Sequence, residues 1–218
     1  MLAIIPVKKN SYRLPNKNIK KFGNYPLFVH TIKMALKSKA ISRVIVSTDS
    51  IKIKNIAIKN GAEVPFLRPK KLTKEKITTW EVSKDIIENL QIKENKIYNS
   101  FIYLQPTSPL RTDIDINKAI RIFKNKKANA VVSVTESKPN FWFKGITKNG
   151  AIINNKLNKM KNYILNGAIY IFKTSYIYKS NSNSYDKKTF AYIMPNERSI
   201  DIDTELDFKT AEFVYKKK

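Results

Sequence analysis

Two aspartates one residue apart near the end of the chain have the spacing of a divalent-metal site. They stand in the run Ser199-Ile200-Asp201-Ile202-Asp203. In an extended backbone, successive side chains point to opposite faces, so both carboxylates share one face and both isoleucines share the other. Mg²⁺ typically takes one or two carboxylates together with phosphate oxygens of a substrate. The run therefore predicts a Mg²⁺ site, while a simpler alternative for Asp203 is a favourable charge at the start of the final helix.

A basic loop follows the first apolar stretch and has the composition of a phosphate-binding loop. Residues 8–18 carry four cations, Lys8, Lys9, Arg13 and Lys17, among hydroxyl and amide side chains. Such groups hold phosphates by charge-assisted hydrogen bonds. The loop contains no glycine, so it is not a P-loop. A solvated basic loop is the alternative, but ligands of open α/β sheets bind beyond the carboxyl ends of the strands, which favours phosphate binding here.

Two further polar loops also follow predicted strands. Residues 105–111 contain two prolines that restrict the backbone of a loop rich in hydrogen-bonding groups, and we expect this loop to form a wall of the substrate site. Residues 47–50 are expected to cap the next helix, with Asp49 in that role. The single histidine, His30, falls inside a predicted helix and is interpreted as structural, because the chain has no second histidine for a metal site.

The elements that must position these loops alternate between short β-branched runs and amphipathic helical stretches. Strands are predicted at 3–7, 43–47, 101–104, 130–134, 168–172 and 189–194, and helices at 26–38, 51–60, 78–90, 114–126 and 204–215. Gly61 is placed for a left-handed helix cap, and Thr204 with Asp207 is typical of a capping box. The alternation predicts an α/β fold, with a mostly parallel sheet that resumes at 168–172 and helices on both faces.

The alternation breaks in residues 136–163, which are rich in lysine and asparagine. We expect a small irregular or hairpin excursion here, with a turn at 149–150. The three consecutive aromatic residues 141–143 indicate either an interface, such as a dimer contact, or local packing, and the sequence leaves both open. We expect residues 1–218 to form one domain with 136–163 as a small insertion.

Bulk composition narrows the classes of function. The chain has 42 Lys and Arg against 17 Asp and Glu, a formal net charge of +25. Such a charge can indicate a nucleic-acid partner, but lysines spread along the whole chain with abundant asparagine and isoleucine indicate coding bias instead. The absence of cysteine excludes disulfides and thiolate metal sites. The apolar residues 1–7 are too few for a signal peptide or membrane span, so we expect a cytoplasmic protein without membrane association.

The sequence resembles the acylneuraminate cytidylyltransferases, or CMP-sialic acid synthetases, with their legionaminate and pseudaminate relatives. The resemblance extends over nearly the whole chain. Its anchors are Ile5-Pro6, Leu14-Pro15, Lys17-Asn18, Pro26-Leu27, 44–49, 61–69, 104–111, 166–170 and 200–204. It implies a Rossmann-like nucleotidyltransferase fold and a homodimer formed through an inserted segment. It also implies that the anomeric hydroxyl of a nine-carbon acidic 2-keto sugar attacks the α-phosphorus of CTP, with Mg²⁺ required and pyrophosphate leaving.

The resemblance implies a catalytic set at the phosphates. Lys8 and Lys17 would hold the triphosphate, and Ser11 would touch a phosphate. Asp201 and Asp203 would hold Mg²⁺. This agrees with the residues themselves, because nucleotidyl transfer needs positioning and charge neutralisation more than covalent help. Mg²⁺ could lower the pKa of the attacking hydroxyl, or one aspartate could accept its proton, and the sequence leaves both open.

The resemblance also implies contacts to the rest of the substrates. In chain order these are Asn18 for ribose, Arg68 and the backbone near Ile77 for cytosine, Thr79 for ribose, and Gln105, Asn166 and Tyr170 for the sugar.

The sequence departs from the family's pattern in three places. Lys8 stands where the family usually has arginine, which keeps the charge but loses the planar fork of a guanidinium. Tyr12 and Arg13 stand where the family has lysine and glycine, so a charge is retained one position later. Ile164 stands where an arginine usually precedes Asn166. The alternative function is therefore a degenerate member that binds nucleotide without efficient turnover.

Overall fold

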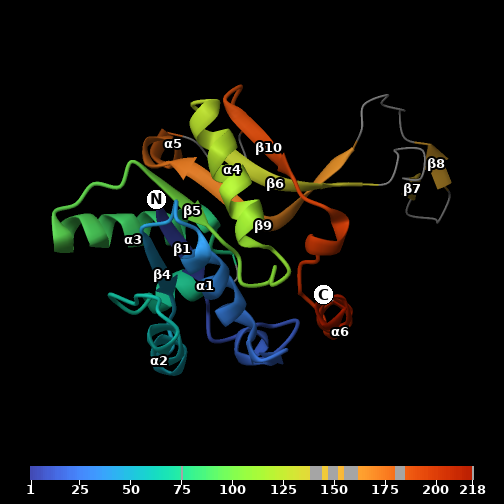
Figure 1. Ribbon diagram of the computed structural model, residues 1–218, viewed down its shortest axis with the longest axis horizontal. Coiled ribbons are helices and arrows are strands. Elements are labelled where there is room, and N and C mark those ends of the chain that lie inside the picture. The colour runs from blue at the N-terminus through green and yellow to red at the C-terminus, as the bar shows by residue number, and fades with distance from the viewer. Residues whose placement is uncertain (75, 138–143, 147–151, 155–161, 180–184, 218) are drawn as a thin grey trace.

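The centre of the molecule is a six-stranded mixed sheet with strand order β10-β6-β9-β5-β1-β4 (Figure 1). The computed structural model describes residues 1–218 apart from 75, 138–143, 147–151, 155–161, 180–184 and 218. The strands are β1 Leu2–Pro6, β4 Arg43–Ser47, β5 Ser100–Tyr103, β6 Ala130–Glu136, β9 Tyr163–Lys173 and β10 Thr189–Ile193. Strand β1 is parallel to β4 and β5, and β10 is parallel to β6, so the predicted parallel character holds for most of the sheet.

The direction of β9 corrects one expectation. We expected residues 168–172 to continue the parallel pattern, but β9 pairs antiparallel with both β5 and β6. The reason is the connection: no helix stands between β6 and β9 in the described chain, and a strand without a helical crossover returns in the opposite direction. The register of this pair shifts between Val132 and Val134. Strand β9 also begins earlier than predicted, at Tyr163.

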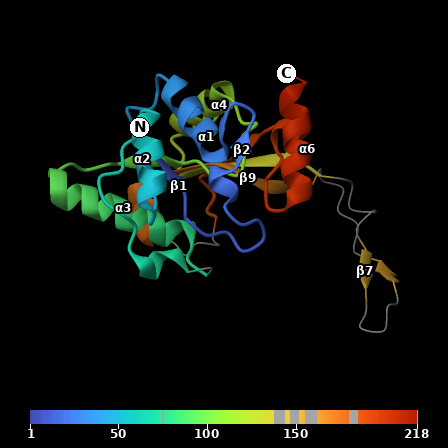
Figure 2. The ribbon, with the colours of Figure 1, turned by 90° about the horizontal axis from the view of Figure 1, so that it is seen from below.

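Helices cover both faces of the sheet, as predicted (Figure 2). They are α1 Leu27–Lys37, α2 Ile51–Lys59, α3 Thr79–Glu94, α4 Asp113–Asn125, α5 Thr174–Lys179 and α6 Glu205–Lys216. The apolar side chains of α1, α2 and α4 pack with Ala3 and Ile5 of β1. Those of α3 and α5 pack with Leu2 and Ile4 of the same strand. This alternation makes β1 a central strand that is buried on both faces.

Several helix ends follow the predicted local chemistry. Thr204 and Asp207 form a capping box at the start of α6. Gly61 has a φ of 87° just after α2, in the left-handed region that favours glycine. The remaining short elements are β2 Lys21–Phe22, β3 Tyr25–Pro26, β7 Lys144–Ile146, β8 Ile152–Asn154, and the 3₁₀ helices η1 Lys17–Ile19, η2 Lys70–Thr73 and η4 Asn196–Arg198. Within the described ranges, no helix combines the length and apolar character needed to cross a bilayer.

The excursion expected in residues 136–163 contains a hairpin. Strands β7 and β8 pair with each other antiparallel and form a separate two-stranded sheet. Both views place this hairpin away from the central sheet (Figures 1 and 2). The aromatic residues 141–143 and the turn at 149–150 lie outside the described residues.

A third apolar cluster joins segments that are distant in the sequence. It contains Leu14 from the first loop, Leu110 from the loop after β5, and Ile202 from the segment before α6. Ile202 is fully buried there, with Phe22 and Phe208 in the same cluster. Burial of each large apolar side chain contributes about 1.5–3 kcal/mol, so this cluster holds the three loops together beside the end of the sheet.

Candidate active site

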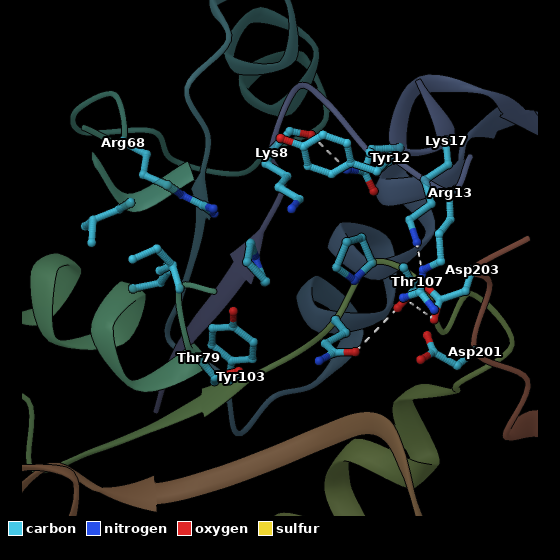
Figure 3. Close-up of a pocket in the computed structure, with 18 of the residues that line it drawn as sticks. Lys8, Tyr12, Arg13, Lys17, Arg68, Thr79, Tyr103, Thr107, Asp201 and Asp203 are labelled. Atoms are coloured by element: carbon cyan, nitrogen blue, oxygen red, sulfur yellow. Dashed lines mark hydrogen bonds and ion pairs between the residues drawn. The ribbon is translucent and has the colours of Figure 1, made fainter. Parts of the chain in front are cut away.

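A cavity of about 420 Å³ lies where β1 and β5 end (Figure 3). Pro6 ends β1 and Tyr103 ends β5, and both line the cavity. Ten of the residues that the sequence singled out line it: Lys8, Ser11, Lys17, Asn18, Arg68, Ile77, Thr79, Gln105, Asp201 and Asp203. The carboxyl ends of the strands therefore bring together the loops chosen for their chemistry, as expected for an open α/β sheet.

The basic loop is held in place mainly through main-chain atoms. Asn18 donates from Nδ2 to the carbonyl oxygen of Lys8 at 2.9 Å. Asp49 accepts from the main-chain N–H of Lys9 at 2.8 Å. This contact corrects the role expected for Asp49, because the cap of α2 is Ser50, which accepts from the N–H of Ile53. Asp49 instead ties the loop after β1 to the loop after β4.

Lys17 connects the basic loop to the aspartate pair. Its side chain is buried, and its ammonium donates to the carbonyl oxygen of Ile202 at 2.7 Å and to Oδ1 of Asp203 at 2.9 Å. Arg13 contacts the other carboxylate oxygen of Asp203 at 2.7 Å. Lys8 lies near the ring of Tyr12, with its ammonium 5.8 Å from the ring centroid. Several cations therefore converge on one end of the cavity.

The alternation predicted for residues 199–203 is confirmed. Ile202 is buried in the third apolar cluster, and Ile200 packs against the same cluster. Asp201 and Asp203 both face the cavity, as Figure 3 shows. The N–H of Ile202 donates to the carbonyl oxygen of Thr107 at 2.8 Å, which fixes the segment against the loop after β5.

The electrostatics of Asp201 differ from those of an isolated carboxylate. Desolvation by the cavity walls raises its pKa, a hydrogen bond from the Thr107 hydroxyl opposes the rise, and the charge of Asp203 adds to it. Two carboxylates with a hydroxyl and an amide nearby form an oxygen-rich donor set that suits a hard cation such as Mg²⁺. Among the described residues no group of three or more His, Cys, Asp or Glu could hold a metal, so a cation held by the two aspartates would keep coordination positions for water or substrate oxygens.

The other end of the cavity is built around Arg68. This side chain is buried, and its guanidinium donates to the hydroxyl of Ser47 at 2.9 Å and to the carbonyl oxygen of Ser47 at 2.7 Å. Burial lowers the pKa of Arg68, while the phenol of Tyr103 and nearby carboxylates oppose this. Burial also raises the pKa of Tyr103 to about 12, against a hydrogen bond with Thr79. Sequence reasoning missed Tyr103, because a tyrosine in a predicted core strand has no feature that marks it as a site residue.

Gly167 forms a close contact between β9 and the cavity. Its φ is 72°, and a Cβ at this position would lie 2.7 Å from Oε1 of Gln105 and 3.5 Å from Oδ2 of Asp201. Both the backbone conformation and the space therefore require glycine here. The glycine was part of the recognised motif, but its close approach to Gln105 is visible only in three dimensions.

Two residues expected at the sugar lie outside the described lining of the cavity. Asn166 is buried and uses its amide internally: Oδ1 accepts from the hydroxyl of Ser133 at 2.6 Å, and Nδ2 donates to the hydroxyl of Ser199 at 2.9 Å. Tyr170 lies opposite Tyr103 in the sheet, and its pKa is raised to about 12, mainly by burial. Asn166 thus links β9 to the segment that carries the aspartates.

Contacts of two arginines that sequence reasoning missed support the site. Arg198 of η4 donates from Nε and Nη2 to both carboxylate oxygens of Asp115, at 3.0 and 2.9 Å. Arg111 is almost fully buried and donates to the carbonyl oxygens of Gln105 and Ala168. The first contact ties the aspartate segment to the start of α4, and the second ties the loop after β5 to β9.

Comparison with known proteins identifies related enzymes of one family. A family model described as cytidylyltransferase matches residues 2–212. The CMP-N,N'-diacetyllegionaminic acid synthase of Legionella pneumophila is 34% identical, over 97% of this chain and 94% of that protein. The N-acylneuraminate cytidylyltransferase of Escherichia coli O18:K1:H7 is 35% identical over 100% of this chain, which spans 52% of that longer protein.

A solved structure extends the comparison to the fold. The structure of a CMP:2-keto-3-deoxy-manno-octonic acid synthetase complexed with CTP superposes with a TM-score of 0.72, covering 99% of this chain and 98% of that one at 13% identity. At this identity the likeness concerns the fold, and it confirms the predicted nucleotidyltransferase architecture. The match to the family model and the identity to full-length relatives go further: this chain belongs to the cytidylyltransferase family.

Proposed function

We propose that this protein transfers CMP from CTP to the anomeric hydroxyl of a nonulosonic acid and releases pyrophosphate. The observation that carries the proposal is the convergence, in one cavity, of the basic loop with Asp201 and Asp203. The names of the relatives, a legionaminic acid synthase and an acylneuraminate transferase, support this class of sugar. The balanced reaction forms a bond from the anomeric oxygen to the α-phosphorus and breaks the bond from that phosphorus to the departing pyrophosphate.

The cationic end of the cavity suits the triphosphate. Lys8 and Lys17 would hold its oxygens, with the hydroxyl of Ser11 as a further donor, because ammonium groups and hydroxyls bind phosphate strongly where water is partly excluded. Lys17 is buried and anchored by two hydrogen bonds, so it is preorganised for this role. Preorganised charges at the phosphates account for most of the catalysis in transfers of this kind.

Asp201 and Asp203 would hold Mg²⁺, which, when bound, neutralises charge on the phosphate oxygens. The two aspartates differ in their surroundings. Asp203 contacts two cations, whereas desolvation raises the pKa of Asp201. The proton of the anomeric hydroxyl would leave either because Mg²⁺ lowers the pKa of that hydroxyl or because one of the two aspartates accepts it.

The opposite end of the cavity would hold the nucleoside. Arg68 and the backbone near Ile77 would frame cytosine, and Thr79 with Asn18 would contact ribose. The Oδ1 atom of Asn18 is buried and has no hydrogen-bond partner, which is consistent with an acceptor that a ligand or a small movement completes. Gln105 would contact the sugar, and Asn166 and Tyr170, outside the described lining, would shape that pocket from behind.

We also propose that the chain acts as one domain, with residues 136–163 as an insertion through which two copies pair. Tyr163, Ile164 and Leu165, at the start of β9 next to this segment, expose large apolar side chains, which is typical of an interface. Because CTP and Mg²⁺ are supplied in the cytoplasm, we place the reaction there. Analytical ultracentrifugation should show a dimer that Ile164→Lys dissociates.

A pyrophosphate-release assay with CTP, Mg²⁺ and a panel of sialic, legionaminic and pseudaminic acids tests the activity. We expect pyrophosphate release with at least one acid. The rate of release should fall at least a hundred-fold in Asp201→Asn, because the charge that develops on the phosphate oxygens loses a ligand of the Mg²⁺ that would neutralise it. Asp113→Asn is a matched control on an aspartate in the first turn of α4. Folded protein that binds CTP by calorimetry but releases no pyrophosphate with any acid would support the degenerate alternative instead.

A further inference from the structure

Both carboxylate oxygens of Asp203 contact a cation in this structure. Oδ1 lies 2.9 Å from the ammonium of Lys17, and Oδ2 lies 2.7 Å from Nη2 of Arg13 (Figure 3). A carboxylate binds a metal through the same oxygens. A cation entering this site must therefore compete with Lys17 or Arg13 for Asp203.

The two competing side chains differ in how firmly they are held. The side chain of Lys17 is 10% exposed, and its ammonium also donates to the carbonyl oxygen of Ile202. The side chain of Arg13 is 70% exposed. An exposed ion pair is worth little free energy, so Arg13 is the partner that can leave Asp203 at small cost.

The net charge of the cavity determines which kind of ligand could compete with Asp203 for Arg13. The described lining carries five cations and two carboxylates: Lys8, Arg13, Lys17, Arg68, Lys74, Asp201 and Asp203. This excess of positive charge disfavours a free divalent cation and favours a polyanion. A guanidinium also matches phosphate oxygens with two parallel hydrogen bonds, which makes a triphosphate a strong competitor for Arg13.

We propose that Arg13 couples metal binding to triphosphate binding at this site. Without a triphosphate, Arg13 occupies Oδ2 of Asp203 and keeps the affinity for a lone divalent cation low. A bound triphosphate attracts the guanidinium, and Oδ2 becomes free for the cation. The inference rests on the proposed function for the identity of the polyanion, but the contact that carries it is the pair between Arg13 and Asp203.

The first test measures Mn²⁺ binding alone, without nucleotide, by the loss of the free-ion signal in electron paramagnetic resonance. Arg13→Ala should bind Mn²⁺ about two- to ten-fold more tightly, since it removes both the competing pair and a repulsive charge. Lys9→Ala removes the same charge from the same loop without touching Asp203 and should change the affinity by less than about two-fold. In an Asp203→Asn background, Arg13→Ala should lose most of its effect. Equal affinities in wild type and Arg13→Ala would overturn the proposal.

The second test measures Mn²⁺ binding with and without inorganic tripolyphosphate. In the wild type, tripolyphosphate should strongly increase the affinity for Mn²⁺, and Mn²⁺ should increase the affinity for tripolyphosphate by the same factor, because coupling between two ligands is reciprocal. The increase should be intermediate in Arg13→Lys and several-fold smaller in Arg13→Ala, because the coupling depends on this side chain. Unchanged enhancement in Arg13→Ala would overturn the coupling. Tripolyphosphate carries no cytosine, so the result is independent of whether the protein turns over CTP, and a failure of the proposed function remains distinguishable from a failure of this inference.

Discussion

Replacing Asp115 by asparagine tests whether a buried ion pair positions the two aspartates of the cavity. The side chain of Asp115 is fully buried, and it accepts hydrogen bonds from Arg198, Tyr192 and Thr112. Arg198 ends η4, a few residues before Asp201. Asparagine has nearly the same shape, but its amide would direct N–H donors at groups that are themselves donors. The change therefore removes the ion pair without creating a large cavity.

The magnitude follows from the surroundings of the carboxylate. Its hydrogen bonds outweigh desolvation and lower the pKa of Asp115 to about 2 from 3.8. This difference corresponds to about 2 kcal/mol of stability. Breaking a fully buried pair costs about 3–5 kcal/mol, and Arg198 is 24% exposed, which favours the lower end. We expect Asp115→Asn to lose about 2–3 kcal/mol and to melt roughly 5–10 °C lower.

Urea and thermal unfolding at pH 7, with steady-state kinetics, provide the assay. Because the folded-state pKa is depressed, the contribution is present above about pH 4 and is lost as the pH falls toward 2, so the variant should lack this part of the acid destabilisation. Glu197→Gln is the control, since Glu197 is 59% exposed and lies 3.6 Å from the same Arg198. It should cost less than about 0.5 kcal/mol. If Asp115→Asn is no less stable than Glu197→Gln, the reasoning is refuted.

Three further predictions concern the glycine, the histidine and the metal. Gly167→Ala should lower kcat/KM at least ten-fold, because its Cβ would displace Gln105. Gly61→Ala, also at positive φ, should lose stability but keep its activity. Equal activities in the two variants would contradict this prediction. Burial lowers the pKa of His30 below 6.5, so the free energy of unfolding should fall as the pH drops below about 6.5. Thermal unfolding between pH 7 and 5 should show a weaker dependence of stability on pH in His30→Asn. EDTA should abolish pyrophosphate release and added Mg²⁺ should restore it, and release that persists in EDTA would exclude the aspartate metal site.

Local patterns in the sequence predicted much of the fold. Each predicted helix is present, although α3 extends beyond its predicted end at residue 90 to Glu94. The alternation of Ile202 with its neighbouring aspartates and the capping box of Thr204 with Asp207 were readable because each depends on a few adjacent residues. The direction of β9 was not readable, because it depends on the path of the intervening segment rather than on the composition of the strand.

The candidate site divides in the same way. The residue types alone indicated phosphate and metal chemistry, and the ordered motifs indicated the family. They could not show that Asp49 accepts a hydrogen bond from the main chain of Lys9, or that the side-chain amide of Asn166 forms hydrogen bonds with Ser133 and Ser199. Hydrogen-bond partners are determined by which groups lie close together in the folded chain. The sequence alone offers each of these side chains many possible partners.

By itself, then, the sequence determined the chemical inventory and the local geometry, because backbone preferences and side-chain periodicity act over a few residues. The tertiary structure decided which charges meet. Lys17 and Asp203 are 186 positions apart, and their contact exists because the third apolar cluster packs Leu14 and Ile202 together. Closing so long a loop is driven by burial of apolar surface, and the polar contacts of the cavity follow from that packing.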